Sequence, residues 1–334
     1  MFNELYEQLR SDDIFKPKSK EEIVQDAAYL VKIAKDTLLS RLGTSATKNE
    51  DGSYDVDGDV DIYEPGRSGS GSPIIPIKFR YVSGYFYCSQ DLISIEGAPI
   101  KVGRDFSCSD NHKLISLKGA PKEVGRNFYC FHCKLNSLEG APEKINGNFD
   151  CSHNKLTSLV GVPRIISKYF RCDDNKLISL EGAPQKVDGY FNCNDNKLTS
   201  LEGAPEKVGE GFSCGYNKLT SLEGAPKEVG EAFDCSYNKL TSLEGAPREV
   251  GGYFYCSNNK LTTLKGAPQR VSRNFYCGYN KLTSLEGAPR EVGRYFVCSG
   301  NKLTSLKGIG KVRGEIFCSD NLVSVGKLLA TIGK

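Results

Sequence analysis

Hydrophobic and polar positions recur along most of the chain with a period of 21 residues. In the unit between Val250 and Pro268, the apolar positions include Phe254, Cys256 and Leu261. A period-2 pattern across Phe-x-Cys predicts a short strand, and Gly-Ala-Pro then prevents a helix on the return path. Each unit is therefore expected to form one strand, a sharp bend and an extended return, and to bury its apolar face against its neighbours.

The cysteines follow this period and supply a packing position. Nine of them recur every 21 residues from Cys130 to Cys298, Cys88, Cys108 and Cys318 extend the series, and Cys133 lies outside it. Parallel side chains in register do not aim sulfur at sulfur, so we interpret these residues as small buried hydrophobes instead of disulfide partners or nucleophiles.

Four regions are expected. Residues 1–43 form an N-terminal helical region, in which Ser19 and Glu22 make a capping box and Gly43 ends the helix. Residues 44–73 comprise a linker, an acidic strand over 53–64 and a flexible loop. Residues 74–325 form the repeat array of about 12 units, and 326–334 a C-terminal cap.

The repeat resembles the bacterial leucine-rich repeat. Leu-Thr-Ser-Leu-Glu-Gly-Ala-Pro, then Val, Phe-x-Cys and Asn-Lys-Leu, is similar to the short subtype in secreted effectors of Gram-negative bacteria and to repeats in bacterial and phage proteins. This chain has Glu-Gly-Ala-Pro where that subtype has Pro-x-Leu-Pro. The resemblance implies a leucine-rich-repeat solenoid with a parallel strand stack, a mostly irregular convex side and a helical N-terminal cap.

Two further columns are polar. An asparagine follows most cysteines by three residues, and its side chain is expected to bond the backbone of the adjoining turn. Lysine follows that asparagine, and glutamate follows the second leucine of many units. We expect the lysine and glutamate columns to face solvent on one rim and to offset each other's charge, and we favour this interpretation over a phosphate-binding stripe.

The positions flanking Phe point outward on the strand (concave) face and break the monotony of the repeat. Tyrosines beside charged residues are typical of protein recognition. The candidate partner-binding residues are Tyr85, Tyr87, Tyr129, Phe131, Asp150, Tyr169, Arg171, Tyr190, Tyr253, Tyr255, Tyr276 and Tyr295. An alternative is that these aromatics only cover the sheet.

The three histidines suggest a metal site as an alternative activity. His132 and His153 share one column, His112 is nearby, and Asp110 and Asp174 flank them in the neighbouring units. Imidazoles one strand spacing apart beside carboxylates are able to hold Zn²⁺. Histidines on an exposed turn are the simpler interpretation.

Alternating carboxylates at Asp55, Asp57, Asp59 and Asp61 suggest calcium. The segment lacks the complete ligand order of a helix-loop-helix site, and its valines equally predict a capping strand with acidic residues outward. We favour the capping strand.

Charge and composition narrow the function. Residues 1–73 carry 9 basic and 15 acidic residues, and the remaining residues carry 35 basic and 26 acidic. The array is therefore only mildly basic, which makes nucleic acid an unlikely partner. An RNA-binding solenoid remains an alternative. Neither a secretory signal nor a membrane-spanning run is visible, and thirteen cysteines then fit a reducing cytosol.

These features predict a non-catalytic protein-binding module without a cofactor. On the resemblance, its role would be that of a phage- or bacterium-encoded inhibitor that sequesters a host defence protein. Self-association through the N-terminal helices is a further possibility, carried by Phe2, Leu5, Tyr6 and Leu9.

Overall fold

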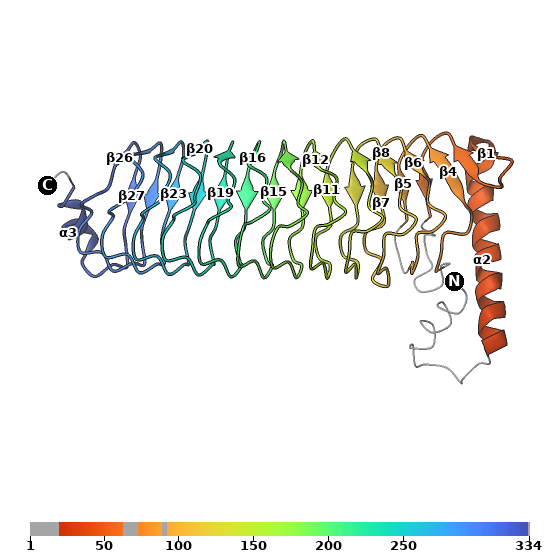
Figure 1. Cartoon of the computed structure of the whole chain (residues 1–334), viewed down its shortest axis with the longest axis horizontal. Helices are drawn as coiled ribbons and strands as arrows, with labels where there is room; N and C mark the ends of the chain where they lie inside the picture. The colour runs from red at the N-terminus through yellow and green to blue at the C-terminus, as the bar shows by residue number, and fades with distance from the viewer. Residues whose placement is uncertain (1–19, 63–72, 89–91, 333–334) are drawn as a thin grey trace. The chain divides into compact units, whose positions relative to one another are not determined.

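The computed structural model describes residues 20–62, 73–88 and 92–332. The chain comprises two compact units, Met1–Asn146 and Gly147–Lys334. Each unit is built from successive coils of the chain (Figure 1). The apolar residues at 2–9, Ser19, and most of the expected 65–73 loop lie outside the described residues.

The described part of the first unit begins with a helix. Helix α2 (Lys20–Leu42) buries Leu38 and ends at Gly43, which adopts a left-handed conformation with φ 52°. A short 3-10 turn (Gly43–Ser45) and strand β1 (Ala46–Lys48) follow, and β1 pairs antiparallel with β2 (Tyr54–Val56). Within the described residues no helix is long and apolar enough to cross a membrane.

The segment expected as one strand over 53–64 is two strands. The chain turns at Gly58, where φ is 129°, between β2 and β3 (Val60–Asp61). β2 pairs in parallel with β4 (Phe79–Val82) and β3 with β5 (Phe86–Tyr87), so the two strands enter different sheets. This segment is therefore the first coil of the stack, which begins before residue 74.

Each coil carries two short strands, one ending at the Val position and one beginning at the Phe position. In the first unit they are β4, β6 (Lys101–Val102), β8 (Glu123–Val124) and β10 (Lys144–Ile145), and β3, β5, β7 (Phe106–Ser107) and β9 (Phe128–Tyr129). The sequence predicted only the Phe strand and an extended return. The second series was missed because a single Val on the return path gives no period-2 alternation.

The second unit repeats this arrangement. Its Val strands are β12 (Ile165–Ile166), β14 (Lys186–Val187), β16 (Lys207–Val208), β18 (Glu228–Val229), β20 (Glu249–Val250), β22 (Arg270–Val271), β24 (Glu291–Val292) and β26 (Lys311–Val312). Its Phe strands are β11 (Phe149–Asp150), β13 (Phe170–Arg171), β15 (Phe191–Asn192), β17 (Phe212–Ser213), β19 (Phe233–Asp234), β21 (Phe254–Tyr255), β23 (Phe275–Tyr276), β25 (Phe296–Val297) and β27 (Ile316–Phe317). Helix α3 (Val325–Leu329) follows and buries Leu328.

Pairing is parallel and in register with the repeat. Phe149 lies opposite Phe170 and Phe254 opposite Phe275, so equivalent residues form ladders. The Phe rings of neighbouring coils lie with centroids 5.0 to 5.8 Å apart in the second unit. The Phe, Cys, Leu and Val columns are buried between the two strand series, which confirms the predicted solenoid of parallel strands.

The asparagine column joins neighbouring coils, as expected. Asn238 is buried, and its Nδ2 donates to the carbonyls of Cys214, Cys235 and Ser236 at 2.9, 3.2 and 3.2 Å, while its Oδ1 accepts from the Leu219 N–H at 2.9 Å. One side chain thus satisfies buried groups of its own coil and of the preceding coil. The same pattern recurs from Asn175 to Asn301.

Cys133 replaces asparagine in one coil of the first unit and reproduces half of this pattern. Its Sγ donates to the Cys108 carbonyl at 3.2 Å. A thiol supplies no equivalent of the amide oxygen, and the Leu114 N–H bonds instead to the Asn111 backbone carbonyl at 2.9 Å.

All thirteen cysteines are free and buried. Burial raises the pKa of thiols such as Cys214, Cys256 and Cys277 well above the ordinary value of 9.0. Several thiols donate to a carbonyl of the next coil, as Cys193 does to Ser213 at 3.2 Å. The thiols are therefore protonated packing residues, as the period predicts.

Replacing Asn238 with Ala is expected to lower the free energy of unfolding by about 3 kcal/mol, because several buried backbone groups lose their partner together. Urea unfolding followed by circular dichroism measures this. The neighbouring exposed Lys239→Ala is the control and should change the value by less than about 0.5 kcal/mol. Equal effects of the two substitutions would contradict the role of the asparagine.

Native protein is expected to react slowly with a thiol-exchange reagent at about pH 8, because the thiolate form is scarce and shielded. Burial raises the pKa of Cys318, in the last coil, but no neighbouring ionisable group raises it further, as such groups do for Cys214. Cys318 should therefore react first. Mass spectrometry of timed samples gives the order. Rapid modification of Cys214 or Cys256 in folded protein would contradict this account.

Candidate functional site

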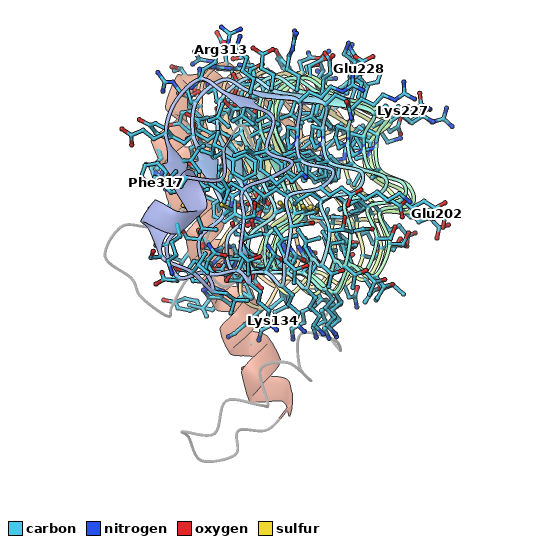
Figure 2. All side chains as sticks on the ribbon, turned by 90° about the vertical axis from the view of Figure 1, so that its left-hand side faces the viewer. Lys134, Glu202, Lys227, Glu228, Arg313 and Phe317 are labelled. Atoms are coloured by element: carbon cyan, nitrogen blue, oxygen red, sulfur yellow. The ribbon has the colours of Figure 1, made fainter. Side chains whose placement is uncertain are left out.

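The outward side chains of the Phe strands form the surface on which the repeat varies, here called the strand face. It lies on one side of each coil. In the second unit Phe317 projects on this side, and Glu202 on the opposite side (Figure 2). Because Phe and Cys point inward, the residue between them and the residues on either side point outward.

In the first unit, the strand face carries aromatic pairs. Tyr85 and Tyr87 stack with centroids 4.3 Å apart, and Tyr129 meets Phe131 edge-on at 6.2 Å. All four rings are half-buried. Burial raises the pKa of Tyr87 above its ordinary value of 10.0. The expected candidates of this unit therefore form two aromatic contacts.

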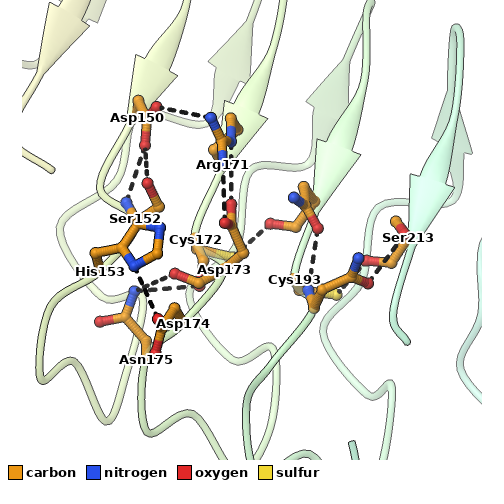
Figure 3. A network of polar contacts seen from close by, with 12 residues as sticks. Asp150, Ser152, His153, Arg171, Cys172, Asp173, Asp174, Asn175, Cys193 and Ser213 are labelled. Atoms are coloured by element: carbon orange, nitrogen blue, oxygen red, sulfur yellow. Dashed lines mark hydrogen bonds and ion pairs between the residues drawn. The ribbon is translucent and has the colours of Figure 1, made fainter. Parts of the chain in front are cut away.

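A polar network begins the strand face of the second unit (Figure 3). Arg171 makes two bonds to Asp173, at 3.1 and 2.9 Å, and lies 3.5 Å from Asp150. Asp150 accepts from the backbone N–H and the hydroxyl of Ser152 at 3.0 and 2.6 Å. The carboxylates are buried and the guanidinium is half-buried, which holds the Arg171 side chain in one orientation.

The network continues towards β17 and β19. Asn194 Oδ1 accepts from the Ser213 hydroxyl at 2.9 Å and the Gly215 N–H at 2.7 Å. The Tyr190 ring lies over Gly211, where a Cβ would meet ring carbons at 2.6 Å. Asp234 accepts from the Ser236 N–H at 2.8 Å, yet burial raises its pKa. Tyr169, by contrast, is 46% exposed.

An aromatic cluster follows on β21, β23, β25 and β27. Tyr255 and Tyr276 stack with centroids 4.8 Å apart and planes 7° apart. Asn274 donates to the Tyr276 hydroxyl at 2.7 Å, and burial raises the pKa of Tyr255 to about 12. The Arg273 guanidinium lies 5.3 Å from the Tyr253 ring, and Tyr295 meets Phe317 edge-on at 5.6 Å. Sequence reasoning missed Phe317, although it continues the Tyr255 column.

A second set of tyrosines was also missed. Tyr216, Tyr237 and Tyr279 lie two residues after their cysteines, at the turn that ends each Phe strand, and have left-handed φ of 52, 56 and 54°. Tyr216 and Tyr237 stack with centroids 4.2 Å apart. The tyrosines are visible in the sequence in the same column as His132 and His153, where only the histidines and their flanking aspartates were interpreted.

Among the histidine positions, His153 pairs with an aspartate. The metal site stays a prediction. Asp110, His132, His153 and Asp174 all occupy that left-handed column, and His112 is exposed at the lysine position. His153 Nδ1 lies 2.8 Å from Asp174 Oδ2. In the described part of the chain, no three His, Cys, Asp or Glu side chains gather to hold a metal ion.

The acidic segment of the first unit links coils. Arg80 makes a paired contact with Asp55, the Ser83 hydroxyl donates to Asp57 at 2.8 Å, and the Tyr85 N–H donates to Asp59 at 3.0 Å. These contacts suit the capping interpretation over calcium binding.

The expectation that lysine and glutamate columns neutralise each other was wrong. The lysines from Lys155 to Lys302 are exposed and make no ion pair among the described residues, whereas Glu244 pairs with Lys265 of its own column at 2.8 Å. Lysine and glutamate are separated by two inward leucines, so they leave the coil at different corners.

Comparison with known proteins gives distant structural similarity. Neither a family model nor a curated protein matches the chain. YopM from Yersinia enterocolitica WA-314 is 15% identical in sequence, with a TM-score of 0.48. The match covers 96% of this chain and 78% of YopM. The APL1 leucine-rich repeat domain is 14% identical with a TM-score of 0.43, covering 67% and 68%. The fold assignment therefore rests on the register of the coils themselves.

Asp234→Asn is expected to raise the unfolding midpoint at about pH 7, because the raised pKa means that the charged carboxylate disfavours folding. In the wild type, this contribution to stability is lost as pH rises from the ordinary value of 3.8 through the raised folded-state pKa. Thermal unfolding at several pH values measures it. Exposed Asp188→Asn is the control, and a destabilised Asp234→Asn would refute the argument.

Proposed function

We propose that this chain is a non-catalytic protein-binding module that holds its partner on the strand face of the second unit. The observation that carries the proposal is the Tyr255–Tyr276 stack together with the fixed Arg171–Asp150–Asp173 network, which lies four strands away in the same sheet. Stacked tyrosines offer large contact area with little rotamer entropy left to lose, and held polar groups supply specificity.

The cost of the polar face supports a role in recognition. Burial raises the pKa of Asp234, so its charged form is disfavoured in the folded protein, and Asp150 and Asp173 are buried with Arg171 between them. Apolar side chains would serve a purely structural sheet surface better. Residues kept at a cost to stability are typical of functional surfaces.

The absence of catalysis is part of the proposal. The buried thiols are protonated, so they are poor nucleophiles. The Ser152 hydroxyl donates to Asp150, and His153 contacts Asp174, so neither prepares the other for acyl transfer. Thirteen free cysteines are compatible with a reducing cytosol as the site of action.

The specific role that we propose is sequestration of a host protein by a bacterial or phage-encoded chain. It is supported by the resemblance of the repeats to those of bacterial effectors and phage proteins. Inhibition would follow from covering the partner's surface, without chemical change to it.

A pull-down with wild type and with Tyr255→Ala plus Tyr276→Ala tests the proposal. Removing two neighbouring aromatic anchors is expected to weaken partner binding by about 3 kcal/mol, roughly 100-fold. Lys207→Ala plus Lys227→Ala, on the Val strand side, is the matched control and should retain the partner. Circular dichroism confirms folding, and the same partners on both double variants would overturn the assignment.

A further inference from the structure

The exposed lysine column of the second unit has no structural explanation in the contacts around it. It comprises Lys155, Lys176, Lys197, Lys218, Lys239, Lys260, Lys281 and Lys302, all exposed. No ion pair with these lysines occurs among the described residues, and the coils that carry them lie about 4.8 Å apart. Like charges opposite each other on neighbouring coils destabilise the stack. A partner of opposite charge would relieve this repulsion.

The missed tyrosines share the edge with this column. Tyrosine at position two after the cysteine and lysine at position four flank the inward asparagine, as Tyr237 and Lys239 flank Asn238. The edge thus presents one ring and one cation per coil at Tyr216, Tyr237 and Tyr279. Alternating aromatic and basic groups are the composition of surfaces that bind single-stranded nucleic acid.

The backbone at these tyrosines points to a role beyond packing. A left-handed φ is unfavourable for a bulky residue and is usually met by Asn, Asp or Gly. Elsewhere the same column indeed holds Asp195, Asn258 and Asp320. The rings of Tyr216, Tyr237 and Tyr279 are 51, 45 and 62% exposed, so burial contributes little in return. Strain of this kind is concentrated at functional positions.

The rings of Tyr237 and Tyr279 do not stack on each other. Tyr237 stacks on Tyr216, whereas Tyr279 leans over Gly300, where a Cβ would meet its ring atoms at 2.7 to 3.2 Å. Only the shorter side chain of Asn258 stands in the coil between Tyr237 and Tyr279. These two residues are two coils apart, about 9.6 Å, so neither ring covers the other.

The carboxylates of neighbouring coils restrict an anion-binding site to the coils from Tyr237 to Gly300. Towards the N-terminus, the left-handed column carries Asp174 and Asp195, and both Asp195 and Asp234 act electrostatically on Tyr216. From Tyr237 to Gly300, this column carries no carboxylate. Phosphate is therefore best accommodated at Lys239, Lys260 and Lys281.

We propose that this edge binds a single-stranded nucleic acid, with bases stacked on the exposed rings of Tyr237 and Tyr279 and phosphates on Lys239, Lys260 and Lys281. The site is separate from the partner surface of the strand face. The sequence argued against nucleic acid because the whole array is only mildly basic, whereas at this edge the basic residues form one exposed column. An acidic peptide would pair with the lysines but leave the tyrosine faces unused. Readout is by stacking and charge, so sequence preference should be weak.

Fluorescence anisotropy with a labelled oligouridine of about 12 nucleotides tests the proposal. Lys239→Gln, Lys260→Gln and Lys281→Gln together are expected to weaken binding at least about tenfold and to reduce the salt-dependence slope by about 2. The matched control is Lys155→Gln, Lys176→Gln and Lys197→Gln, which removes the same charge from the same column. Its effect should be less than about threefold.

Tyr279→Asn separates stacking from charge, because asparagine already occupies this conformation at position 258. It should weaken oligouridine binding about tenfold while leaving the salt slope unchanged. Four results would overturn the proposal: no binding at about 50 mM salt, equal losses in both triple variants, an unchanged Tyr279→Asn, or equal affinity for a glutamate-rich peptide or an RNA duplex. In each of these cases, the proposed protein-binding function would still hold if a pull-down finds a partner whose binding depends on Tyr255 and Tyr276.

Discussion

The hydrogen bonds of the inward asparagines are the interaction on which the rest of the structure depends. A coil of 21 residues without a helix leaves many backbone groups inside the stack, and two-residue strands satisfy only a few of them. The asparagine amide reaches carbonyls of two coils and an amide of the preceding one, as Asn238 does. It fixes both the bend and the distance between coils, and the Phe and Cys columns pack on that frame.

The same frame explains why side chains on the surface lie in straight columns. Since register is constant, each outward position meets its equivalent on the next coil, and clusters form only where neighbouring coils carry compatible residues. Arg171 between Asp150 and Asp173, and Tyr255 on Tyr276, are such places. Single substitutions in a repeat can therefore create a local surface without disturbing the core.

The repeat period let the sequence predict the solenoid, the buried cysteines and the bonding role of asparagine, because each is a property of a whole column. It did not predict the second strand series, since a lone Val between charged residues and a glycine, as in Lys-Glu-Val-Gly, gives no alternation to detect. The break at Gly58 was missed for a similar reason, because Val56 and Val60 fit one strand as well as two. The pairing of Lys and Glu failed because sequence distance does not show which corner of a coil a side chain leaves from. The aromatic pairs of the strand face were foreseeable from column membership, but the conformation of Tyr237 and Tyr279 required coordinates.

The equal length of the coils has a consequence for how such a surface changes over time. Recombination that duplicates or deletes one whole coil of the second unit preserves every asparagine bond on either side of the junction. It moves the aromatic cluster relative to the Arg171 network by one strand spacing, about 4.8 Å. The separation between two contact regions is thus adjustable in fixed steps, by a genetic event that leaves the interior intact.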